Sequence, residues 1–279
     1  MGILGAPADP SAGVGPARAA AFRRLCRSSP WRWETLRFSV EWTAAPGPAP
    51  TGPPAPGPGS GVVPVPRVDA WLRRPDALRV QDPEGTLLFS TTRINASRGS
   101  FYVAATRTSW LLPPRLTNPV YDDDGLVRRR PEAAYGDPVF GDPFWAAMLD
   151  PVELAGNAPV PTEIPFSNVV EIHRLDDALH HGRPVLEAVV SPNRTFRPAC
   201  AGHPLIGAGR TRVAIDVPTG VCVATEVLDG PGAGAGHRID IHGVDEYMLD
   251  DLFVEQSMHL TDVRDHIPWI VPPEGRARR

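Results

Sequence analysis

Hydrophobic and polar residues alternate along two long parts of the chain, and this alternation predicts strands. In residues 31–42, Leu36, Phe38, Val40 and Trp42 recur at a spacing of two, as in a half-buried strand. Shorter strand patterns, separated by Pro-Asp, Pro-Glu-Gly and Arg-Gly turn signals, follow at 67–74, 78–82, 86–92, 100–106 and 108–112. Five more come after Pro165, at 167–175, 183–192, 210–218, 220–228 and 237–245. Strands that follow one another without helices between them favour an antiparallel meander.

Two segments have helical patterns. Residues 17–29 are rich in Ala and Arg and predict a short helix. In 142–156, Asp142 suits the N-cap and Pro143 the first helical position, while Pro151 leaves open a division into two short helices. The sequence therefore predicts an α+β fold, with about ten antiparallel strands in one strongly curved sheet and helices over its concave face.

A proline- and glycine-rich stretch interrupts the first strand region. Residues 46–66 contain nine Pro and five Gly. Because proline has no backbone N–H, the segment cannot donate the hydrogen bonds of a sheet, and it has too little apolar surface to become ordered. A passive, disordered loop is favoured over a proline motif for a partner domain. The expected organisation is a flexible N-terminus with a short helix (1–30), a single domain (31–255) carrying this insertion, and a C-terminal extension (256–279).

Three phrases in the chain resemble the LolA-like family, lipoprotein carriers and related proteins. They are the strand–turn–strand "WLRRPDALRV" (71–80), the paired strands "SFYVAATRTSW" (100–110) and the late hairpin "VAIDVPTGVCVATEVLDG" (213–230). "RIDIHGVDEYMLDDLF" (238–253) is similar to the last strand and exit of actinobacterial members. The resemblance implies an unclosed β-barrel with helices as a lid. The carriers are exported, whereas this chain shows no export signal, and no diagnostic ligand residue carries over from them.

Composition and charge narrow the classes of partner. The net charge is −4 and the pI about 6.1, so the chain has no electrostatic footprint for nucleic acid or an anionic membrane surface. No stretch reaches the length of a membrane span, and no secretory signal or lipoprotein cleavage site is recognised, which predicts a cytoplasmic protein without an integral membrane segment. The odd count of three cysteines, without CxxC spacing, favours buried, inert thiols.

No residue pattern in the chain points to catalysis, a cofactor or a metal. His180 and His181 are adjacent on a turn, and His237 and His242 fall on opposite faces of a strand, so solvent-facing histidines are favoured over a metal site. "YDDDG" (121–125) lacks the alternating oxygen ligands of an EF-hand. We expect no cofactor, no metal and no enzymatic activity.

Aromatic residues concentrate in the first half of the chain, and on a curved sheet they can line a cavity for an apolar ligand. The alternative is that they only fill the core. The cavity candidates are Phe38, Trp71, Phe89, Phe101, Trp110, Phe144 and Met148.

The predicted function is non-catalytic binding of an apolar or lipid-like small molecule in the concavity of the sheet. One alternative is a regulatory or sensing module that binds a protein partner on the same fold. Another is a hydrolase with a scattered site, which would be favoured if two histidines and a carboxylate converged within about 3 Å hydrogen-bond reach.

Overall fold

The computed structural model describes residues 14–43, 67–94, 112–132, 136–140, 144–161, 167–199, 204–230 and 232–254. Several sequence predictions fall outside these ranges. They are the insertion at 46–66, the extension at 256–279, the strand at 100–106 and most of the one after it, and the candidates Phe101 and Trp110.

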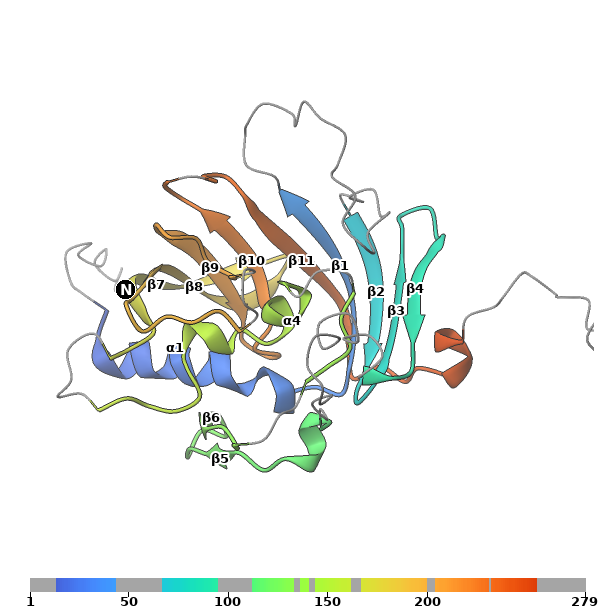
Figure 1. The fold of residues 1–279 in the computed structure, drawn as a ribbon, viewed down its shortest axis with the longest axis horizontal. Coiled ribbons are helices and arrows are strands. Elements are labelled where there is room, and N and C mark those ends of the chain that lie inside the picture. The colour runs from blue at the N-terminus through green and yellow to red at the C-terminus, as the bar shows by residue number, and fades with distance from the viewer. Residues whose placement is uncertain are drawn as a thin grey trace, which may run out of the picture.

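One antiparallel sheet of nine strands dominates the fold (Figure 1). Its strands are β1 (Thr35–Thr43), β2 (Arg67–Arg73), β3 (Ala77–Gln81), β4 (Leu87–Thr91), β7 (Val170–His180), β8 (Arg183–Pro192), β9 (Thr211–Asp216), β10 (Cys222–Val227) and β11 (Gly236–Val244). They lie in the order β4-β3-β2-β1-β11-β10-β9-β8-β7. Because β4 and β7 are the two edges, these strands form an open, curved sheet, and the predicted α+β class is confirmed. A separate two-stranded ribbon is formed by β5 (Val120–Tyr121) and β6 (Val127–Arg129).

The first strand occupies the centre of the sheet. β1 pairs with β2 on one side and with β11 on the other. Leu36, Phe38 and Val40 are fully buried on the concave face, as the spacing of two predicts. Arg37 and Glu41 alternate with them and point to the outer face, where Arg37 donates to Glu246.

The helices lie on the concave side of the sheet (Figure 1). They are α1 (Pro16–Ser28), α4 (Phe144–Leu149) and the 3₁₀ helices η1 (Ser29–Trp31) and η3 (Val152–Leu154). Two further 3₁₀ helices lie elsewhere: η2 (Pro114–Leu116) beyond α1, and η4 (Asp250–Phe253) on the outer face of the sheet. The predicted helix at 142–156 is thus divided on either side of Pro151. Along the described parts of the chain, no helix is long and apolar enough to cross a membrane.

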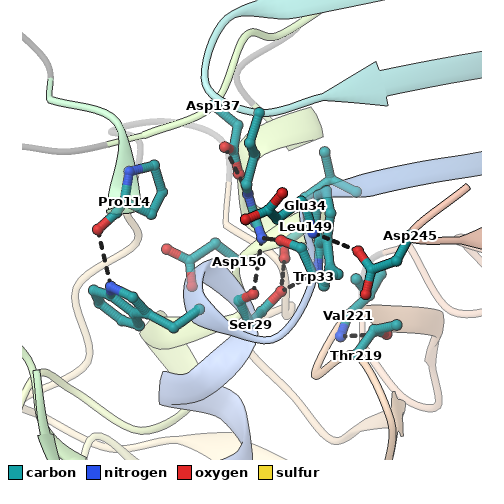
Figure 2. Close-up of polar contacts among 12 residues, drawn as sticks. Ser29, Trp33, Glu34, Pro114, Asp137, Leu149, Asp150, Thr219, Val221 and Asp245 are labelled. Carbon is teal, nitrogen blue, oxygen red and sulfur yellow. Dashed lines mark hydrogen bonds and ion pairs between the residues drawn. The ribbon is translucent and has the colours of Figure 1, made fainter. Parts of the chain in front are cut away.

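Polar contacts fix the end of α1 to the segment that carries α4. The Ser29 hydroxyl donates to the Leu149 carbonyl over 2.6 Å and accepts from the Trp33 indole over 3.3 Å (Figure 2). Arg27 donates to the carbonyls of Ala155 and Gly156. Main-chain oxygens at the end of a short helix lack intrahelical partners, so these side chains provide the missing donors.

Two buried acidic groups hold further segments in place. Asp137 accepts both ends of the Arg74 guanidinium at 2.8 and 2.9 Å, and both side chains are almost fully buried. The Arg74 guanidinium also lies 3.3 Å from the centroid of the Trp33 ring. Glu153 accepts the backbone N–H groups of Ala199 and Leu205, and burial raises the pKa of its carboxyl.

The turn between β9 and β10 packs against the end of α1. Gly220 has a φ of +73°, a conformation that favours glycine, and a Cβ there would lie 3.1 Å from both the Leu25 carbonyl oxygen and the Ser29 nitrogen. The Pro-Thr-Gly turn predicted from the sequence therefore also serves as a docking point for the helix.

Candidate ligand-binding site on the concave face

Four of the seven cavity candidates come together. Phe38 and Met148 are buried in the main core, and Phe89 and Phe144 are partly buried against it. Trp71 does not join them. It belongs to a second cluster on the outer face of β2, with Ala77, Met248 and Phe253, because its neighbours Val68, Ala70 and Leu72 already point to the concave face.

Four aromatic side chains form a continuous row from the edge of the sheet to its centre. Ring centroids are 6.0 Å apart between Phe89 and Phe140, 5.9 Å between Phe140 and Trp145, and 5.4 Å between Trp145 and Phe38. These are normal separations for favourable aromatic pairs. We call Phe89, Phe140, Trp145 and Phe38 the aromatic row. It begins at the partly exposed rings of Phe89, on edge strand β4, and Phe140, and ends at the buried rings of Trp145 on α4 and Phe38 on β1.

Two members of the row, Phe140 and Trp145, are absent from the residues predicted to line the cavity. Phe140 lies in the irregular segment 136–140, where hydrophobic periodicity gives no signal. The sequence of α4 places Phe144 and Met148 on one side, whereas the side chain that α4 buries most completely among the aromatics is Trp145. A helix of six residues is too short for its periodicity to define a buried face.

The Trp145 indole carries one of the buried polar atoms that make no hydrogen bond in the described structure. Its side chain is 1% exposed, and its Nε1–H has no hydrogen-bond partner in the described structure. By contrast, Trp31 donates to the carbonyls of Pro114 and Thr117, and Trp33 donates to the Ser29 hydroxyl. Buried indole N–H groups usually find an acceptor, so the one on Trp145 requires an explanation.

His237 lies next to this row and is uncharged. It is fully buried on the concave face of β11, and its ring meets Phe144 edge-on at 5.4 Å. Its Nε2–H donates to the Cys222 carbonyl at 2.8 Å, so Nδ1 accepts from the Thr225 hydroxyl at 2.9 Å. Burial lowers the pKa of the imidazole to about 4. His237 and His242 do face opposite sides of the strand, but the expectation that His237 faces solvent is wrong.

A second polar group lies on the outer face. The Nδ1 atom of His181 lies 3.6 Å from the Asp240 carboxylate, and that of His242 lies 4.0 Å from it. The Nε2 atom of His242 is 3.2 Å from the Ser39 hydroxyl. This hydroxyl also accepts a hydrogen bond from Arg67. The two His–Asp distances exceed the roughly 3 Å of a hydrogen bond that would favour a hydrolase. Within the described residues, no group of three or more His, Cys, Asp or Glu side chains is placed to hold a metal ion.

The two cysteines in the described part of the chain are poor nucleophiles. Cys26 on α1 and Cys222 on β10 are free and buried. Burial raises the pKa of the Cys26 thiol to about 12 and that of Cys222 well above its usual value, so neither forms a thiolate near neutral pH. The expectation of buried, inert thiols is confirmed for this pair, while Cys200 lies outside the described residues.

Comparison with known proteins adds little to this picture. No model of a known protein family matches the chain, and no curated protein does. Among solved structures, the crystal structure of MucB matches over 87% of this chain with a TM-score of 0.33 and 12% sequence identity. The match covers 64% of the MucB chain, so this chain spans less than two thirds of its length. A likeness at this level leaves function to be argued from the site itself.

Proposed function

We propose that the protein binds an apolar, lipid-like small molecule in the concavity of its sheet and catalyses no reaction on it. The observation that carries this proposal is the aromatic row, which leads from partly exposed rings at the sheet edge into the fully buried centre. An apolar ligand that entered along this row would remove its own surface from water at about 25 cal/mol per Å².

The concave face is suited to such a ligand because its side chains are apolar over many strands. The buried residues on β1, β2 and β3 that face the core are Leu36, Phe38, Val40, Val68, Ala70, Leu72, Leu78 and Val80. In the described structure, Trp145 of α4 packs on Phe38 of β1 in this face, and Phe140 of the irregular segment 136–140 packs on Phe89 of β4.

The cover over the aromatic row is short and is held mainly at its C-terminal end. There the Ser29 hydroxyl donates to the Leu149 carbonyl, and Arg130 pairs with Asp150. Because α4 has only six residues, its own hydrogen bonds contribute little, and the part that precedes Leu149 depends on packing by Trp145 and Met148. In this proposal the ligand enters by a local rearrangement of that part of α4, while the C-terminal end stays fixed.

Binding can be tested with an uncharged fluorescent probe, N-phenyl-1-naphthylamine, together with native mass spectrometry of the purified protein. We expect saturable probe uptake and displacement of the probe by long-chain apolar molecules. Phe140→Asp places a charge in the aromatic row and is expected to abolish uptake. Leu179→Asp, at a position that is 74% exposed, is the control and is expected to bind normally.

An apo mass without any adduct, combined with no probe uptake by the wild-type protein, would reject the proposal. Equal uptake by the Phe140→Asp variant would show that the probe binds elsewhere. A protein-interaction module on the same fold would give the first of these results.

A further inference from the structure

We propose that the ligand is an uncharged molecule with a hydrogen-bond acceptor at one end, and that this acceptor binds the Trp145 Nε1–H at the inner end of the aromatic row. The inference rests on the proposed function and specifies the ligand's chemistry and orientation. Esters and ketones with a long apolar chain are the class that fits.

The unpaired indole N–H is the first argument. Folding removed this donor from water without supplying an acceptor from the described residues, which is unfavourable because the lost hydrogen bond to water is not replaced. The neighbouring rings, Phe38 and Phe140, offer no oxygen. A ligand oxygen that accepts this hydrogen bond would relieve the unsatisfied donor, so oxygen-bearing ligands gain over pure hydrocarbons.

The order of burial along the row sets the orientation. Phe89 and Phe140 are partly exposed, whereas Trp145 and Phe38 are 1% and 0% exposed. The acceptor must therefore reach the inner end, and the apolar chain must extend back past Phe140 toward Phe89 and edge strand β4. The ligand thus lies with its polar end inward and its apolar end toward the edge of the sheet.

Because the side chains of the aromatic row carry no charge, the hydrogen-bond acceptor of the ligand should be uncharged as well. The four side chains of the aromatic row are neutral, and so is Met148 beside them. The titratable side chain of His237 contacts Phe144, and both of its ring nitrogens already make hydrogen bonds within the protein. An ionised carboxylate at the inner end would lose its hydration without meeting a cation, which is strongly unfavourable.

Three probes of similar chain length test this chemistry: tridecane, 2-tridecanone and laurate at pH 8. Their affinities are measured by displacement of N-phenyl-1-naphthylamine. We expect 2-tridecanone to bind roughly tenfold more tightly than tridecane, because it satisfies the buried donor, and laurate to bind more weakly than the ketone. In ¹H–¹⁵N spectra, the Trp145 indole resonance is expected to shift downfield with the ketone and to stay in place with tridecane.

Trp145→Phe keeps an aromatic ring and removes the donor, so it is expected to bind the ketone and the hydrocarbon equally. Trp31→Phe removes an indole N–H that is already bonded to Pro114 and Thr117, and is the matched control. If Trp145→Phe fails to fold, the indole shift in the wild-type protein still decides the question.

The possible failures are distinguishable. If none of the probes binds, the proposed function itself is rejected. If tridecane binds as tightly as the ketone and the Trp145 resonance does not move, the site recognises only apolar surface and the inference is overturned. An indole N–H that already donates to the face of the Phe140 ring would give this result. If laurate binds as tightly as the ketone, the requirement for an uncharged acceptor is wrong.

Discussion

The buried imidazole of His237 predicts a loss of stability in mild acid. In the unfolded chain a histidine titrates near 6.5, whereas in the folded protein the pKa of His237 is lowered to about 4. Between these two values the unfolded state binds a proton that the folded state does not, so the free energy of unfolding falls as the pH falls from about 6.5 toward 4. A difference of about 2.5 pKa values corresponds to roughly 3 kcal/mol.

His237→Gln separates this contribution from that of other groups. The glutamine amide can donate to the Cys222 carbonyl and accept from Thr225 as the imidazole does, but it does not titrate. Urea unfolding at pH 7 and pH 4 is expected to show that the wild-type protein loses about 3 kcal/mol more than the variant between the two values. Equal losses in the two proteins, or an NMR titration of His237 with a midpoint near 6.5, would refute the reasoning.

Three further substitutions test the contacts that fix the cover and the turns, each measured as a free energy of unfolding in urea. Gly220→Ala adds both backbone strain and a close contact with α1, so it is expected to lower the free energy of unfolding by about 2 kcal/mol or more. The control Gly182→Ala has a φ of +78° and nothing within 4 Å of the added Cβ, so it should cost only about 1 kcal/mol. Equal costs would contradict the docking of the β9–β10 turn on α1. Asp137→Asn leaves the buried guanidinium of Arg74 without its counter-charge and is expected to cost about 3 kcal/mol, so a loss below about 1 kcal/mol would mean that the pair is solvated. Glu153→Gln replaces one of two backbone-accepting oxygens by an amide nitrogen and is expected to cost roughly 1–3 kcal/mol, and a neutral result would show that the two N–H groups find other acceptors.

Local periodicity was sufficient to predict the sheet. The alternation of Leu36, Phe38 and Val40 predicts both the strand and its buried face, and the strand patterns after Pro165 correspond to β7 through β11. The same rule, applied to β2, places Trp71 on the outer face, opposite Val68, Ala70 and Leu72. Trp71 was a cavity candidate because it is one of the aromatic residues in the first half of the chain. The residues that pack on it, Met248 and Phe253, are too far along the chain for a local pattern to reveal.

The site is less predictable than the sheet because half of its row, Phe140 and Trp145, comes from outside the sheet. Phe140 has no strand or helix period, and Trp145 lies in a helix shorter than two full turns. Their positions follow from long-range contacts: Ser29 with Leu149, and Arg130 with Asp150. The first contact joins a side chain to a main-chain carbonyl more than a hundred residues away, and the second joins two side chains twenty residues apart. No spacing rule identifies such contacts in advance. The buried face of His237 could have been inferred, since Ile239 and Ile241 share its alternation.

The central position of β1 has a consequence for how the protein is made. One edge of β1 pairs with β2, but the other waits for β11, and Leu36 meets Val244 in that ladder. At about 5–20 residues per second, a ribosome needs roughly 10–40 s to synthesise the chain between these strands. During that time the nascent chain presents an apolar strand with an open edge, the kind of surface that invites pairing with other chains. Chaperone binding to the first strand is therefore expected to matter more for this protein than for one whose neighbouring strands are consecutive in sequence.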